Sequence, residues 1–418
     1  MNIMNGLLKS ILLIAVAIAA TSCRGIVGYT AKMIKIYNGT VSYNDNDKVN
    51  DDTIHFVINH RNCMLMKATI NGMEDTVLYD SGANSSVIQF FTKETKPKGM
   101  KFYRMPVEGA DKKTKVKISP IPVHIETPMC IVDHFGNAML LEKQTHSCDN
   151  EPSIKKFPVV GFPGLDFPPF SIDFTNNRMF HIHDMSEIDT TEYIPVKCRH
   201  DKNVLFIYPI INGVEHECIF DTGNSGGILV KDEQKIDNHT DTDLLYEGSI
   251  GMSIGGLTEK KRFVVVPENT IEFAGQKETV PVMYLGDNLT SNNVGLQYIK
   301  RFDWVVGYQV LQRDENQTIT SLTYKLYAKP HVADTTKMKY PDHSYAVTTF
   351  DGTLKIATRL LDGQERFEVG DQIVSVDGED ITEENICYYY DLLTETKDWS
   401  GFDIQVKGSE GSTKHARQ

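Results

Sequence analysis

Two aspartates lie 141 residues apart in matching triplets, Asp80-Ser81-Gly82 and Asp221-Thr222-Gly223. Hydrolysis of an amide bond needs a base that activates water and an acid that polarises the carbonyl group and later protonates the amine. Two carboxyl groups held about 3 Å apart cannot both ionise, so they share one proton and supply both roles. Because such a pair titrates as a unit, the residues alone do not say which aspartate is the acid.

The segments before the two aspartates are also duplicated. Ile70-Asn71-Gly72-Met73-Glu74 precedes the first and Ile211-Asn212-Gly213-Val214-Glu215 the second, with asparagine nine residues ahead of aspartate in both. A single triplet of this kind is most often a simple turn, because aspartate and serine bond their own backbone and glycine takes positive φ. Two copies with equal offsets indicate an internal repeat. We therefore expect two similar lobes, each contributing one aspartate to a shared site.

Short strands must deliver these aspartates. From residue 53 onward, β-branched and aromatic runs alternate with Asn-Gly, Pro and Gly, which is typical of strands and turns. Residues 64–70 and 74–79 predict a hairpin that leads into Asp80, and residues 204–211 and 215–220 predict its counterpart before Asp221. Glycine after each triplet hydroxyl lets the chain turn sharply and leaves room around the carboxyl groups. The predicted fold class is mainly β.

A further pair of similar runs sets the extent of the two lobes. Val159-Val160-Gly161 follows Asp80 by 81 residues, and Val305-Val306-Gly307 follows Asp221 by 86. These runs predict lobe one over residues 53–190 and lobe two over residues 191–330. A cleft between the lobes would hold the substrate under a mobile hairpin.

Two polar segments are candidates for such a hairpin. They are residues 106–117 in lobe one and the glycine-rich residues 248–258 in lobe two, since glycine-rich tips suit a lid. An ordinary hairpin is the alternative for each.

The two ends of the chain differ from the lobes. Residues 340–410 predict a small third domain, with a strand inside Gly370–Ile381 and a helix starting near Thr382. Residues 1–22 contain a short apolar run after Lys9 and predict a signal peptide. The small residues before Cys23 resemble a bacterial lipobox, which implies lipidation of that cysteine. The polar residues 23–52 would then be a lipid-anchored linker.

Charge and cysteine content limit the function. The net charge is −13, and no basic stripe is present for phosphate neutralisation, so we expect no nucleic-acid partner. Six cysteines follow Cys23; the pairing is open, with Cys130 and Cys148 the best pair across a polar loop. Cys63 and Cys218 lie in apolar runs and predict buried thiols.

The triplets and the apolar-apolar-Gly runs resemble the pepsin and retropepsin superfamily of aspartic peptidases. Gly370-Asp371-Gln372-Ile373-Val374-Ser375-Val376-Asp377-Gly378 is similar to a run found in PDZ domains. Together they resemble bacterial envelope proteins that join a retropepsin-like unit to a C-terminal PDZ domain. The resemblance implies two β-barrel lobes plus an α+β domain.

For the residues, the resemblance implies catalysis by Asp80 and Asp221. The hydroxyls of Ser81 and Thr222 would bond across the lobes to hold the pair, with Gly82 and Gly223 beside them.

The expected function is therefore an aspartic endopeptidase acting on exported peptides or proteins, without a cofactor or metal. Because both triplets are in one chain, a monomer would suffice. The PDZ-like domain would bind C-terminal peptides, although no Gly-Leu-Gly-Phe-type loop is present. His181 and His183 could share a strand face, but an outer strand without metal is the simpler interpretation. The alternative is a catalytically silent envelope adaptor that binds peptides through the cleft and the PDZ domain.

Overall fold

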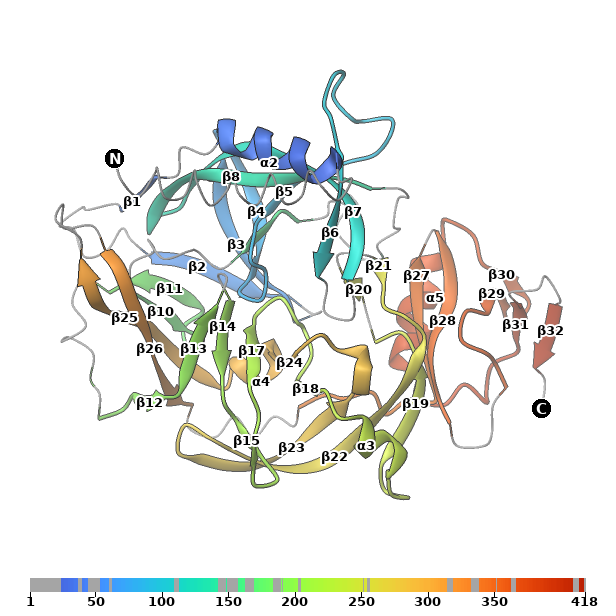
Figure 1. Ribbon diagram of the computed structural model, residues 1–418. Helices are drawn as coiled ribbons and strands as arrows, with labels where there is room; N and C mark the ends of the chain where they lie inside the picture. The colour runs from blue at the N-terminus through green and yellow to red at the C-terminus, as the bar shows by residue number, and fades with distance from the viewer. Residues whose placement is uncertain are drawn as a thin grey trace.

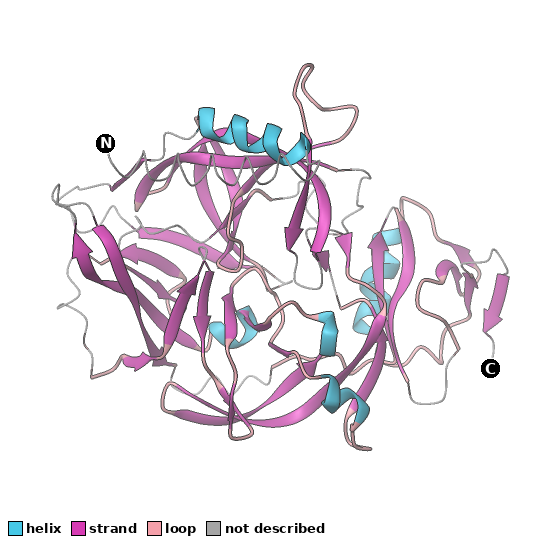
Figure 2. Ribbon diagram, in the orientation of Figure 1, coloured by secondary structure: helices cyan, strands magenta, loops and turns pink. Residues whose placement is uncertain are grey.

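The protein is mainly β, as predicted, with two large sheets (Figures 1 and 2). The computed structural model describes residues 24–36, 40–43, 53–59, 62–108, 113–141, 148, 157–161, 169–182, 189, 191–201, 204–250, 252–253, 256–313, 319–331, 338–350, 352–361, 366–408 and 413–416.

The first sheet has 14 strands within these residues. In order across the sheet they are β12 (Ile194–Val196), β26 (Ile319–Pro330), β25 (Phe302–Arg313), β10 (Phe170–Asp173), β11 (Arg178–His181), β2 (Thr53–Ile58), β3 (Met64–Ile70), β4 (Met73–Asp80), β9 (Val159–Gly161), β5 (Val87–Phe91), β8 (Cys130–Leu140), β7 (Lys113–Glu126) and β6 (Tyr103–Glu108), with β1 (Thr40–Tyr43) beside β8.

The second sheet has 16 strands in the same described part of the chain. Its path runs β13 (Cys198–Asp201), β14 (Val204–Ile207), β17 (Cys218–Asp221), β24 (Asn292–Gly295), β18 (Ile228–Val230), β23 (Gln276–Tyr284), β22 (Lys261–Phe273), β19 (Leu244–Gly248), β28 (Thr353–Leu360), β29 (Gln372–Val376), β31 (Ile404–Lys407) and β32 (Thr413–Ala416). Four short strands join it at the side: β15 (Ile210–Ile211), β16 (Val214–Glu215), β27 (Tyr345–Phe350) and β30 (Glu379–Asp380).

The remaining elements are short. β20 (Met252–Ser253) and β21 (Gly256–Leu257) form a separate hairpin. The helices are α2 (Arg24–Ile36), α3 (Glu233–Asp237), α4 (Leu296–Ile299) and α5 (Ile386–Glu395), with a 3-10 turn η2 (Gly286–Asn288).

The two predicted Asn-Gly hairpin turns are confirmed. Asn71 and Asn212 both have φ of 50°, and the following glycines have φ of 82° and 84°, the left-handed values that a tight hairpin turn requires. Each asparagine side chain also accepts a 2.9 Å hydrogen bond from a backbone N–H of a neighbouring long strand, His124 on β7 or Thr270 on β22. The repeated asparagine therefore ties each hairpin to the sheet beside it.

The predicted counterpart of Val159-Val160-Gly161 is wrong. In the first sheet β9 pairs parallel with β4, so that Gly161 lies opposite Asp80. In the second sheet β24 pairs parallel with β17, and Gly295 lies opposite Asp221. The structural equivalent is therefore Asn293-Val294-Gly295, whereas Val305-Val306-Gly307 belongs to β25.

Strand β25 has a different task, which is to join the two halves of the molecule. It pairs antiparallel with β10 from the first half and with β26 from its own half. Trp304 on β25 is fully buried and its ring lies edge-on to Phe220, directly before Asp221. The hydrophobic core thus runs without interruption from one half to the other.

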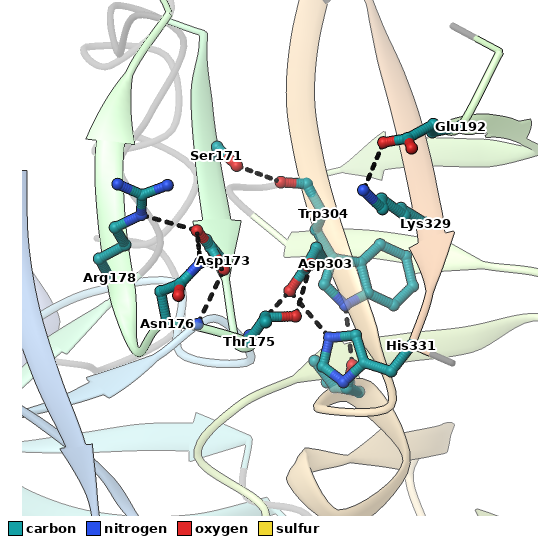
Figure 3. Close-up of polar contacts among 11 residues, drawn as sticks. Ser171, Asp173, Thr175, Asn176, Arg178, Glu192, Asp303, Trp304, Lys329 and His331 are labelled. Carbon is teal, nitrogen blue, oxygen red and sulfur yellow. Dashed lines mark hydrogen bonds and ion pairs between the residues drawn. The ribbon is translucent and has the colours of Figure 1, made fainter. Parts of the chain in front are cut away.

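A buried polar network reinforces this junction (Figure 3). Asp303 on β25 accepts hydrogen bonds from the backbone N–H and hydroxyl of Thr175, at 3.0 and 2.9 Å, and contacts His331 Nε2 at 2.8 Å. Burial alone raises the pKa of Asp303, but the bonds from His331 and Thr175 outweigh it and leave the pKa below its usual value. The ionised form of Asp303 is therefore favoured by folding.

We expect Asp303→Asn to lower the free energy of unfolding by about 1–3 kcal/mol at neutral pH, because charge-assisted bonds inside the junction are lost. A carboxyl group with a depressed folded pKa stabilises the protein above its unfolded pKa, and this contribution is lost as pH falls through the folded value. The difference between variant and wild type should therefore shrink in acid. Denaturant titrations at several pH values measure both effects.

The control for this prediction is Glu192→Gln, which removes an exposed ion pair with Lys329 on the same junction (Figure 3). Exposed pairs contribute little, so its effect should stay small. Equal losses from Asp303→Asn and Glu192→Gln would contradict the assignment.

The C-terminal strands form a unit with its own core, which includes Leu354, Ile373 and Trp399. This unit lies beside β19 (Figure 1), and β28 continues the second sheet from that strand. Arg359 on β28 reaches Glu247 on β19 at 3.0 Å. The predicted helix exists but begins at Ile386, since residues 382–385 form a turn in which Thr382 N–H donates to the Asn385 side chain.

The cysteine pairing differs from the prediction. Cys148 is bonded to Cys387 on α5, and Cys130 is a buried free thiol. Cys130 packs in the main core, whereas Cys148 belongs to the core of the C-terminal unit, so their closeness in sequence does not bring them together. Cys218 is a buried thiol as predicted, while Cys63 is only half-buried.

The polar linker predicted for residues 23–52 is corrected in its first part. Arg24–Ile36 form helix α2, which lies across the first sheet near β8 (Figure 1). Tyr29 donates to Asn137 and Lys32 donates to Ser119, both on that sheet. Cys23, the signal segment and residues 44–52 lie outside the described residues. Among the described helices, none is long and apolar enough to cross a membrane.

Candidate active site

Asp80 and Asp221 meet, as the sequence predicts. Each is the last residue of its strand, β4 or β17, and each is followed by a tight turn that a hydrogen bond closes onto its own carbonyl group, from Ala83 N–H or Asn224 N–H. The two carboxyl groups are hydrogen-bonded to each other. Two distant segments of the chain thus form one buried acidic pair.

Ser81 and Thr222 hold the two turns together. The Thr222 hydroxyl accepts from Ser81 N–H at 3.0 Å and donates to the carbonyl group of Tyr79 at 2.9 Å. The Ser81 hydroxyl accepts from Thr222 N–H at 2.9 Å and donates to the carbonyl group of Phe220 at 2.7 Å. Both residues have no exposed surface. Four reciprocal bonds therefore fix the spacing of the aspartates that precede them.

The glycines of the triplets leave room for the opposite carboxyl group. A Cβ placed on Gly82 would lie 2.5 Å from Cγ of Asp221, and one placed on Gly223 would overlap the carboxyl group of Asp80. Neither glycine needs a positive φ. The requirement is a close approach of the backbone, which any side chain would prevent.

Burial determines the protonation of the pair. Burial raises the pKa of Asp80 well above its usual value, and the charge and hydrogen bond of Asp221 raise it further. Burial also raises the pKa of Asp221, but hydrogen bonds from Asn293, Asp80 and two backbone N–H groups oppose this rise. Like charges in contact disfavour double ionisation, so the pair holds one proton over a wide pH range.

Asn293 is the residue at this site that the sequence analysis missed. It lies on β24 beside β17, is 6% exposed, and its Nδ2 donates to Asp221 Oδ2 at 2.5 Å. Nothing in the linear sequence marks it, because its place follows from the parallel pairing of β24 with β17.

The two candidate lid segments are antiparallel hairpins in the structure. β6 pairs with β7 in the first half, and β20 pairs with β21 in the second. Both tips, residues 109–112 and 254–255, lie outside the described residues. Ser249 at the root of the second hairpin donates from its N–H to the carbonyl group of Ala357 on β28 at 2.9 Å, so this hairpin is attached to the C-terminal unit.

Within the described residues, no group of three or more His, Cys, Asp or Glu side chains is arranged to hold a metal ion. His181 lies at the end of β11, and His183 is outside the described part.

Comparison with known proteins gives no further guide to this site. No family model matches the chain, and no curated protein matches it.

Proposed function

We propose that this protein is an aspartic endopeptidase of the pepsin and retropepsin type that cleaves exported peptides or proteins. One observation carries the proposal: two buried carboxyl groups from duplicated strand-turn units share a hydrogen bond inside a reciprocal Ser81–Thr222 bond network. A structural turn needs neither the second carboxyl group nor the burial. Two ionisable groups buried together cost stability unless they serve a function.

In the proposed mechanism, water lies against both carboxyl groups. The ionised aspartate takes a proton from water as its oxygen attacks the carbonyl carbon, and the protonated aspartate gives its proton to the carbonyl oxygen. The resulting tetrahedral diol collapses when the amine receives a proton and the C–N bond breaks. Charge within the pair is the same before and after, so neither a metal nor an organic cofactor is required.

The test is digestion of a peptide library by the purified protein from acidic to neutral pH. Cleavage that a hydroxyl-bearing transition-state analogue blocks is the expected result, since such an analogue occupies the place of the attacking water. Absence of cleavage at every pH, with the protein folded, would reject peptidase activity.

A silent peptide-binding adaptor is the second candidate, and strand β27 favours it. Among the described strands β27 pairs only with β28, and helix α5 packs close to it. An extended peptide could add to its other edge, the mode used by PDZ domains. Binding of a peptide with a free C-terminus, lost on amidation, supports this role. Equal binding of both forms contradicts a carboxylate-reading site.

The proposed location is the bacterial cell envelope, with the chain anchored by lipid on Cys23. The Cys148–Cys387 disulfide supports export, because disulfides persist mainly in oxidising compartments. Metabolic labelling with a radioactive fatty acid should mark the wild type but not Cys23→Ala. Equal labelling, or none in either protein, would remove the anchor from the proposal.

A further inference from the structure

The two aspartates have nearly the same surroundings, with one difference. Asp80 accepts from Gly82 N–H at 3.0 Å and Asp221 accepts from Gly223 N–H at 2.9 Å. A second backbone N–H, of Ala83 or Asn224, also favours the charged form of each. The residue next in position is Val159 on β9 for Asp80, and Asn293 on β24 for Asp221. Only Asp221 therefore has a side-chain amide against it at this position.

The direction of the Asn293 amide is fixed by a chain of bonds. Gly226 N–H, which can only donate, bonds Asn224 Oδ1 at 2.8 Å. The Asn224 Nδ2 then donates to Asn293 Oδ1 at 2.7 Å. The Asn293 Nδ2 is left to donate to Asp221 Oδ2. Reversing either amide would place two donors or two acceptors against each other, so Asp221 always faces a donor.

Asp221 therefore meets donors on both of its oxygen atoms. Oδ2 faces Asn293, and Oδ1 faces the N–H groups of Gly223 and Asn224 at 2.9 and 3.1 Å. Donors that cannot accept favour the charged form of a carboxyl group. The remaining partner of Asp221 is the carboxyl group of Asp80, which can supply the shared proton.

We infer that Asn293 makes the acidic pair unequal, holding Asp221 as the carboxylate and leaving the shared proton on Asp80. This inference rests on the proposed function and deepens it. Asp221 becomes the base that takes a proton from water as the new C–O bond forms. Asp80 becomes the acid whose O–H bond breaks as the carbonyl oxygen is protonated. Asn293 is a positioning residue, because it acts through Asp221 and not on the substrate.

The inference has a consequence for pH dependence. The groups facing Asp221 are the Asp80 carboxyl on β4, the Asn293 amide on β24 and the N–H groups of its own turn. Tyr79, also on β4, stays neutral because burial and the charge of Asp80 raise its pKa. Asn293 stabilises charge on Asp221, so it lowers the pH at which the pair first ionises. Activity in acid should therefore depend on Asn293.

The test compares the pH–rate profile of Asn293→Val with that of the wild type. Valine matches Val159 of the other half, and the acid limb should move upward by about one pH unit, the size of a lost bond to a charged group. Asn293→Asp keeps the shape of the side chain and adds a negative charge, so its shift should be at least as large. The alkaline limb, set mainly by Asp80, should move less.

Val159→Asn is the mirror control, since it places the amide beside Asp80 instead, and its acid limb should not move upward. Carbon-13 NMR titration of the aspartate carboxyl groups measures the same ionisation without any turnover. If the wild type cleaves nothing, the proposed function fails while the NMR titration still decides on Asn293. An unchanged first ionisation in folded Asn293→Val and Asn293→Asp, or an equal upward shift in Val159→Asn, would overturn the inference.

Discussion

Asp80→Asn and Asp221→Asn are each expected to reduce peptide cleavage by about a thousandfold or more. Asparagine is close to aspartate in shape, but it can neither hold the charge that activates water nor pass the shared proton. The two carboxyl groups are already hydrogen-bonded to each other, so each loss removes the pair as a unit. Initial rates on the best peptide from the library measure the effect.

The same two variants should be more stable than the wild type near neutral pH. A carboxyl group whose folded pKa is raised opposes folding at any pH above its unfolded value, because the folded protein must then bind a proton or bury a charge. Burial raises the pKa of both Asp80 and Asp221. The stability gain should fade in acid, where both states are protonated. Denaturant titration over pH measures it.

Loss of activity together with gained stability separates a functional pair from a structural one. A structural turn would lose stability when its aspartate is replaced, since the aspartate would be bonding the backbone that it holds. Cleavage that survives either substitution would exclude the pair from the mechanism. Peptide binding that is indifferent to both, without cleavage by the wild type, would favour the adaptor.

The parts of the site that the sequence predicted depend on local chemistry. Asn71-Gly72 and Asn212-Gly213 specify hairpin turns on their own, and the Asp-Ser/Thr-Gly triplets specify the turns that follow. Equal spacing between these signals carried the prediction that the aspartates meet. Short-range turn preferences act through φ and so are readable from a few residues.

The parts that were missed depend on pairing between distant strands. Asn293-Val294-Gly295 lies beside Asp221 although it lacks the first apolar residue of Val159-Val160-Gly161. The true run follows its aspartate by 74 residues and the imitation in β25 by 86, against 81 in the first half. Because loops of different length intervene, spacing favoured the wrong strand. The bond between Cys148 and Cys387 spans 239 residues and is equally invisible locally.

Thr222→Val is expected to weaken both the fold and the site, because valine keeps the shape of threonine but removes its hydroxyl. Ser81 N–H and the carbonyl group of Tyr79 would lose their partner in a region without exposed surface. Leaving buried groups unsatisfied costs about 1–3 kcal/mol each, so the free energy of unfolding should fall by about 2 kcal/mol or more. Denaturant titration measures this loss.

Activity should fall more than stability in Thr222→Val. The bonds between Ser81 and Thr222 set how closely Asp80 and Asp221 approach, and a displacement of about 1 Å in reacting groups costs about a hundredfold in rate. Thr222→Ser is the control: serine fills the equivalent place in the other half of the site and bonds Phe220 there, so this variant should keep both stability and cleavage. If valine and serine behave alike, the hydroxyl does not hold the pair, and the spacing of the two carboxyl groups must come from the packing around Trp304 and Phe220.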